Sequence, residues 1–259
     1  MSLIKRYIEA CEAEEAMTEW IRAHADLGVE PGDDEWEDLK AEYLSRQVVD
    51  DDYWEDEFFQ DEVFRLESEN YAFCQFSEQM NELIGDITYK PSDSALKMNY
   101  SYSITLMETC LGDMIKSLIL KNKYFFENAI KNVDELKKEK LSLRDVYQNP
   151  DIVKTVVIRK FSDYLYHNIE KTVQVYSAVL GEKIPDNVMK EIPEICKIAL
   201  IRHDIVHRNG SDKDGKKINL NKEILLKALG DISNFVKSMS VWISTAECNL
   251  QKRPLTSTE

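Results

Sequence analysis

The sequence IRHDIVHRNG, at residues 201–210, combines two arginines, two of the chain's four histidines and a helix stop signal. Apolar residues precede it at the spacing of a helix, and Asn209-Gly210 closes it. Glycine accepts the left-handed backbone that ends a helix. We therefore predict the last turns of a helix, with Arg202, His203 and His207 crowded at its C-terminal end.

The spacing of these side chains limits how one copy of the motif can act. His203 and His207 are four residues apart and share a helix face. Arg202 and His207 are five residues apart, which places them about 140° from each other around the helix. One copy would not easily clamp a single atom with both side chains. Two copies related by a two-fold axis could surround one phosphate.

This arrangement of arginine, polar residue and histidine before Asn-Gly resembles the Arg-x4-6-His motif of HEPN domains. In that family the residue after the arginine is usually polar, and here it is His203. HEPN domains are helical bundles that usually dimerise, and many are metal-independent ribonucleases. The resemblance implies a homodimer in which Arg202 and His207 of each protomer face one groove. It covers about the last three-fifths of the chain, and it implies a toxin or phage-defence effector.

Histidine and arginine suit metal-independent cleavage of RNA. The attack of a 2′-hydroxyl on the adjacent phosphate needs a base, an acid and a cation. Imidazole titrates near neutrality, and guanidinium forks onto phosphate oxygens. Arg202 and His207 would therefore be catalytic, with His203 orienting groups or binding phosphate, and the product would carry a 2′,3′-cyclic phosphate. Asp204 could hold a histidine tautomer or pair with an arginine.

Several residues after the helix could bind flanking phosphates of an RNA chain. They are Arg208, Asn209, Lys213, Lys216 and Lys217. A further candidate comes from an apolar run near residue 108. Glu108 is a lone acid there, and a buried acid wants a partner. Glu108 could orient Arg202 or a histidine, or it could reach solvent at the edge of the core.

Two other interpretations of the motif remain open. His203-Asp204-x-x-His207 imitates the His-Glu-x-x-His helix of zinc hydrolases, although a third ligand would have to come from elsewhere. Basic residues at a helix C-terminus can also simply stabilise the helix dipole. His167 is a lone histidine, for which a structural role is the more common one. The sequence contains no P-loop, Rossmann or esterase motif, and we predict no metal and no cofactor.

Charge is distributed unevenly along the 259 residues, whose net charge is −15. Residues 1–80 contain 24 acidic and 6 basic residues, a net charge of −18. The remainder contains 24 acidic and 27 basic residues, a net charge of +3, so a phosphate chain can bind there. The acidic, aromatic stretch from about residue 50 to 85 predicts a solvated helical face. Alternatively, it screens a neighbouring basic groove or docks a partner protein.

The remaining composition favours a helical, cytoplasmic protein. Only 8 Gly and 6 Pro are present, and the 5 cysteines show no paired spacing. No apolar run approaches the ~20 residues of a bilayer span, so we expect no membrane partner.

Helical periodicity and turn signals divide the chain into regions. We predict an all-α protein, with an acidic, aromatic-rich helical region at 1–91, an up-and-down HEPN-like bundle at 92–250 and a loose tail at 251–259. In the bundle, long helices are expected from Ser92 or Asp93 to about 120, from Asn149-Pro150 with a pattern that extends to residue 180, and from Asn219 or Asn221.

The function that we favour is metal-independent endoribonuclease. The alternative is a non-catalytic HEPN-like module that binds nucleotide, RNA or protein. In that case the acidic N-terminal region would recruit the partner, and an antitoxin is one such partner.

Overall fold

The computed structural model describes residues 3–25, 29–43, 71–87 and 90–252. The chain divides into two compact units, Met1–Glu62 and Val63–Glu259. The charge divides at the same place. Residues 1–62 contain 21 acidic and 5 basic residues, whereas residues 63–259 contain 27 and 28. The second unit is therefore almost neutral, which permits binding of a polyanion.

The first unit contains two helices in its described part. Helix α1 spans Leu3–His24, and a second helix occupies residues 34–43. The Trp20 ring stacks on His24, with centroids 4.1 Å apart, and lies 5.4 Å from the Tyr43 ring. Both helices lie in the region at 1–91 that was predicted to be helical. The aromatic stretch around residues 50–59, for which a helix was also expected, lies outside the described residues.

The second unit is a helical bundle in its described part, which confirms the predicted all-α class. Its helices are α3 (Tyr71–Gly85), α4 (Asp93–Lys121), α5 (Lys123–Asn132), α6 (Asp134–Lys137), α7 (Leu143–Gln148), α8 (Ile152–Ser162), α9 (Ile169–Leu180), α10 (Asp186–His207) and α11 (Lys222–Gln251). Among the described helices, none has both the length and the apolar character that crossing a bilayer requires.

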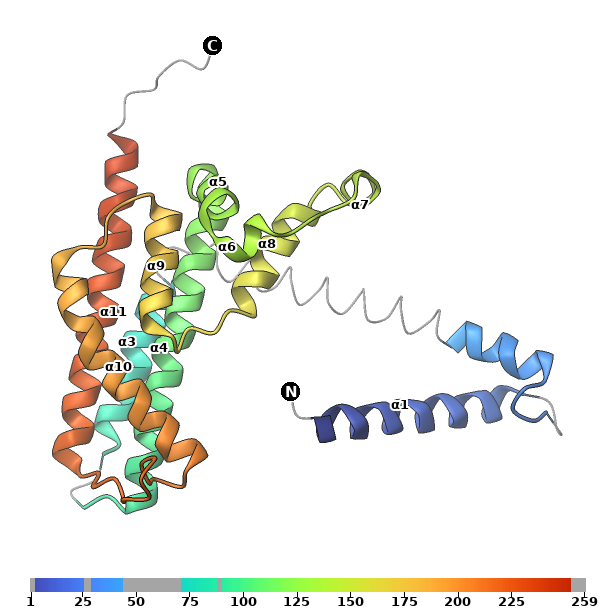
Figure 1. The fold of residues 1–259 in the computed structure, drawn as a ribbon, viewed down its shortest axis with the longest axis horizontal. Coiled ribbons are helices and arrows are strands. Elements are labelled where there is room, and N and C mark those ends of the chain that lie inside the picture. The colour runs from blue at the N-terminus through green and yellow to red at the C-terminus, as the bar shows by residue number, and fades with distance from the viewer. Residues whose placement is uncertain (1–2, 26–28, 44–70, 88–89, 253–259) are drawn as a thin grey trace, which may run out of the picture. The chain divides into compact units, whose positions relative to one another are not determined.

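Helix α4 is the centre of the bundle. It packs against α3, α5, α8, α10 and α11, and in Figure 1 it runs alongside α11. Its apolar residues surround the helix on nearly all sides, because neighbours cover nearly all sides. Side-chain caps fix the starts of the two longest helices. The Ser92 hydroxyl accepts from the Ala95 N–H at 3.1 Å, and Asn221 Oδ1 accepts from the Ile224 N–H at 2.9 Å.

The division between the units lies earlier than the sequence suggested. We predicted a boundary between residues 91 and 92, but α3 packs on α4 and α11. The buried side chains Phe76, Met80 and Leu83 of α3 recur at helical spacing and form part of the bundle core. The Gly and Pro signals of residues 84–93 therefore mark a connection between packed helices.

The helix predicted to continue from residue 152 to 180 is interrupted at residues 163–168. Tyr166 turns back into the bundle, and its hydroxyl donates to the Phe161 carbonyl near the end of α8 at 2.9 Å. Asn168 then caps α9 by accepting from the Lys171 N–H at 3.2 Å. His167 consequently lies in the connection between two helices, not on a helix. A smaller difference is that α8 begins at Ile152, after Pro150. Helix α10 continues through Pro193.

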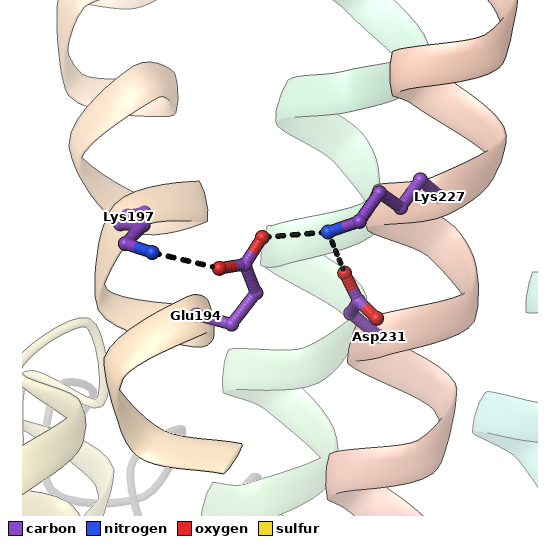
Figure 2. Close-up of polar contacts among 4 residues, drawn as sticks. All are labelled: Glu194, Lys197, Lys227 and Asp231. Atoms are coloured by element: carbon purple, nitrogen blue, oxygen red, sulfur yellow. Dashed lines mark hydrogen bonds and ion pairs between the residues drawn. The ribbon is translucent and has the colours of Figure 1, made fainter. Parts of the chain in front are cut away.

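Charged side chains join α10 to α11 beside the bundle core. Figure 2 shows Lys227 of α11 between Glu194 of α10, at 2.6 Å, and Asp231 of α11, at 3.0 Å. Lys197 pairs with the other oxygen of Glu194 at 3.0 Å. The hydrogen bond from Lys227, followed by that from Lys197, lowers the pKa of Glu194. This network helps to set where α10, which carries the motif, lies on α11.

Two glycines inside long helices allow a matched test of packing. A Cβ on Gly112 of α4 would lie 3.0 Å from the Tyr166 ring, whereas a Cβ on Gly230 of α11 would meet nothing within 4 Å. We expect Gly230→Ala to raise stability by about 0.5–1 kcal/mol through helix propensity. Gly112→Ala has the same gain in helix propensity, but it forces the buried Tyr166 to move, at a cost of about 1–3 kcal/mol. Urea unfolding should therefore rank Gly230→Ala above Gly112→Ala, and the reverse order would contradict this packing.

Candidate functional site

The motif ends α10 as predicted, and the buried Asp204 organises that end. The Asp204 carbonyl accepts from the N–H groups of Arg208, at 3.0 Å, and Gly210, at 3.1 Å. Its carboxylate is paired with the Arg208 guanidinium. Asn209 and Gly210 both have left-handed backbone, with φ of 52° and 78°. Asp204 therefore takes the arginine-pairing role, one of the two that the sequence suggested for it.

A short turn carries the three lysines after the helix. Ser211 and Lys217 form an antiparallel bridge. Asp212 Oδ1 closes the turn by accepting from the N–H groups of Asp214 and Lys216, both at 2.9 Å. Lys213, Lys216 and Lys217 are exposed on this turn and do not line the groove described next.

An open groove of about 640 Å³ lies along the exposed side of the motif. Helix α10 contributes Arg202, His203 and His207, α4 contributes Glu108, and the connection before α9 contributes His167. Arg202 and His207 thus line one groove of a single protomer, although they are far apart around the helix. The neighbouring lining residues are Ile104, Asn168, Ile169, Glu170, Cys196, Ala199 and Leu200.

The two histidines of the motif lie against each other. Their ring centroids are 4.7 Å apart, with 46° between the ring planes, and both side chains are exposed. The pair therefore occupies one side of the groove, where both rings reach solvent. This follows from their four-residue spacing on α10.

Glu108 and Arg202 both line the groove, and each has one buried polar atom. Among the described residues, Glu108 Oε1 and Arg202 Nε have no hydrogen-bond partner. Burial raises the pKa of Glu108, and the nearby Arg202 and then His167 offset part of that rise. Buried polar atoms are normally satisfied, and these two belong to oppositely charged residues that line one groove.

The raised pKa of Glu108 predicts that this residue destabilises the fold at neutral pH. The charged form of Glu108 is disfavoured in the fold. Its ionisation therefore lowers the free energy of unfolding, an effect that is absent below the ordinary pKa and grows as the pH rises toward the folded pKa. We expect Glu108→Gln to unfold at a higher temperature than the parent at neutral pH. The difference should shrink as the pH falls, while Glu78→Gln, at an exposed position on α3, should change little. A lower unfolding temperature for Glu108→Gln than for the parent at neutral pH would contradict a raised pKa for Glu108.

The described geometry does not favour the zinc interpretation of His203-Asp204-x-x-His207. In a zinc hydrolase the acid of this motif is the general base, but Asp204 is buried and bound to Arg208. Within the parts of the chain that the structure describes, no three His, Cys, Asp or Glu side chains are placed to hold a metal ion.

The structure gathers only some of the predicted site residues. Arg202, His203, His207 and Glu108 share the groove. Asp204 and Arg208 pair with each other beside it, and Asn209 shapes the helix end. Sequence reasoning missed His167 as a groove residue, because its position depends on the break between α8 and α9. The one available signal was Asn168, a helix N-cap residue directly after it.

Comparison with family models, curated proteins and solved structures found no match to this chain.

Proposed function

We propose that this protein is a metal-independent endoribonuclease whose scissile phosphate binds in the α10 groove. One observation carries the proposal: Arg202 and two adjacent exposed histidines of the motif helix line the same groove. The resemblance of the motif to HEPN domains gives the same reaction class. The role as a toxin or phage-defence effector rests on that resemblance alone.

The chemistry follows from the three residue types. The guanidinium of Arg202, which lines the groove, would offset the charge that develops on the phosphate. His207 would transfer a proton and His203 would bind phosphate or orient its neighbour. Glu108, which acts electrostatically with Arg202, would position that guanidinium. The products would be a 2′,3′-cyclic phosphate and a 5′-hydroxyl.

Residues outside the groove would hold the flanking RNA. Lys213, Lys216 and Lys217 are exposed on the turn that directly follows the motif helix. Arg208, paired with Asp204, still has a half-exposed side chain and could contact phosphate from its free side. Such contacts are independent of sequence and weaken with salt, so binding should fall steeply as salt is raised.

A homodimer through α10 completes the proposal. Met189 and Leu200 are 51% and 61% exposed and continue, at helical spacing, into His203 and His207. An apolar stripe that leads into the site is the kind of surface that a second copy covers. The two grooves would then lie beside each other across the two-fold axis, each with the Arg202 and His207 of its own protomer.

This surface gives a direct test of assembly. We expect Leu200→Glu to raise the dimer dissociation constant at least about 10-fold, because a two-fold axis places the charge in the interface twice. Sedimentation velocity would measure the effect. Val241→Glu, at a 55% exposed position on α11, is the matched control. An equal effect of both substitutions would contradict an interface on α10.

The function itself is tested by incubating the purified full chain with RNA in EDTA. The proposal expects cleavage by the parent and by His24→Ala, and a loss of about 10²–10⁴-fold for His207→Ala. RNA binding without cleavage by the parent would support the alternative, a binding module to which the acidic first unit brings a partner.

A further inference from the structure

His167 is a groove residue for which the proposed function has no use. It is exposed, it lines the groove with Arg202, His203 and His207, and it comes from a different element of the fold. Glu108 of α4 lines the same groove, and the nearby His167 is one of the two residues that lower its pKa. One protomer therefore brings three histidines to a single groove.

The backbone on both sides of His167 is fixed. Tyr166 is buried, its hydroxyl donates to Phe161, and its carbonyl accepts from the Thr172 hydroxyl at 3.3 Å. Asn168 caps α9 through the Lys171 N–H. The side chain of His167 is thus exposed on an anchored backbone, which is the arrangement that pre-organises a catalytic group.

An in-line displacement at phosphorus needs groups on two sides. The attacking and the leaving oxygen lie on opposite sides of the phosphorus atom, so the base and the acid must flank it. His203 and His207 cannot divide these tasks easily, because their rings lie 4.7 Å apart on one face of α10. His167, from the connection before α9, offers an imidazole from another direction.

We propose that His167 is a further catalytic residue, which shares proton transfer with His207 of the same protomer. This inference rests on the proposed ribonuclease function. One imidazole takes the proton of the 2′-hydroxyl as the 2′ oxygen bonds to phosphorus. The other gives a proton to the 5′ oxygen as its bond to phosphorus breaks. No atom is oxidised or reduced, and neither water nor metal is consumed.

Cleavage of RNA in EDTA by the full-length chain provides the first test. We expect His167→Gln to cut about 10²–10⁴-fold more slowly than the parent, as loss of a proton-transfer group does. His24→Gln is the matched control, since that ring stacks on Trp20 in the first unit. Parent-like cleavage by His167→Gln, together with loss in His207→Gln, would overturn the inference and leave the proposed function standing.

Mixing the two variants tests whether the pair lies in one protomer. If His167 acted on the site of the second copy, mixed dimers of His167→Gln and His207→Gln would each contain one intact site. Activity would return to about a quarter of that of the parent, because random exchange makes half of the dimers mixed. We expect no return, since every protomer in the mixture lacks one member of the pair. Recovery would overturn the same-protomer assignment.

A binding measurement separates failure of this inference from failure of the proposed function. The chain has four histidines, so their ring signals can be followed individually by NMR while inorganic phosphate is added. We expect the His167 signal to shift together with those of His203 and His207, with His24 as the reference. Shifts of His203 and His207 alone would overturn the inference. No shift of any of the three would overturn both proposals.

Discussion

Replacement of Arg202 by alanine is expected to slow RNA cleavage by about 10²–10³-fold, as removal of one preorganised donor to a developing anion does elsewhere. Arg202 is the cation of the groove, and its Nε–H has no partner among the described residues. The substitution therefore removes no hydrogen bond at that atom, and the fold should persist. Arg202→Lys should recover only part of the loss, because an ammonium lacks the planar fork of guanidinium.

Single-turnover cleavage would measure the effect of Arg202, and Arg144→Ala is the control. Arg144 is an exposed arginine on α7, away from the groove residues. Its loss should change binding slightly and the rate of the chemical step not at all. Equal rates for the parent and Arg202→Ala, at saturating RNA, would contradict the role given to the guanidinium.

The largest expected effect on stability comes from Tyr176 of α9. Its side chain is 0% exposed, and its hydroxyl donates to the Leu111 carbonyl of α4. Tyr176→Ala should lower the free energy of unfolding by about 3–5 kcal/mol, because it leaves a cavity where α9 meets α4. Tyr176→Phe keeps the ring and should cost about 1–3 kcal/mol, since a buried carbonyl loses a donor.

Another tyrosine provides the comparison for Tyr176. Tyr147 is 89% exposed on α7, a helix that Figure 1 shows extending away from the bundle. Tyr147→Ala should change the free energy of unfolding by no more than about 0.5 kcal/mol. Urea unfolding would measure all three variants. Similar losses for Tyr147→Ala and Tyr176→Ala would contradict the burial of Tyr176 against Leu111.

Local chemistry explains which parts of the fold could be predicted from sequence. The starts of α4 and α11 were found because Ser92 and Asn221 bond to N–H groups three residues on. The break between α8 and α9 was missed because it depends on where Tyr166 packs, against Gly112 of α4. No local pattern contains that contact. The turn residues before α4 suggested a domain boundary, yet only packing decides whether a connection separates domains.

The residues of the candidate site could also be predicted only in part. Arg202, His203 and His207 could be chosen because they are neighbours in sequence at one helix end. Glu108 could be chosen because it is a lone acid in an apolar run, and it does line the groove. His167 has no such mark in the sequence, and the fold alone brings it beside them. The charge of Arg208 predicts a contact with RNA, whereas its pairing with the buried Asp204 is seen only in the structure.

The most direct measurement is the chemistry of the RNA ends that purified protein produces in EDTA. A metal-independent site built on Arg202 and His207 predicts cleavage that leaves 2′,3′-cyclic phosphate and 5′-hydroxyl ends. His207→Ala and Arg202→Ala should each slow this cleavage strongly. Cleavage that EDTA abolishes, or that His207→Ala retains in full, would contradict it.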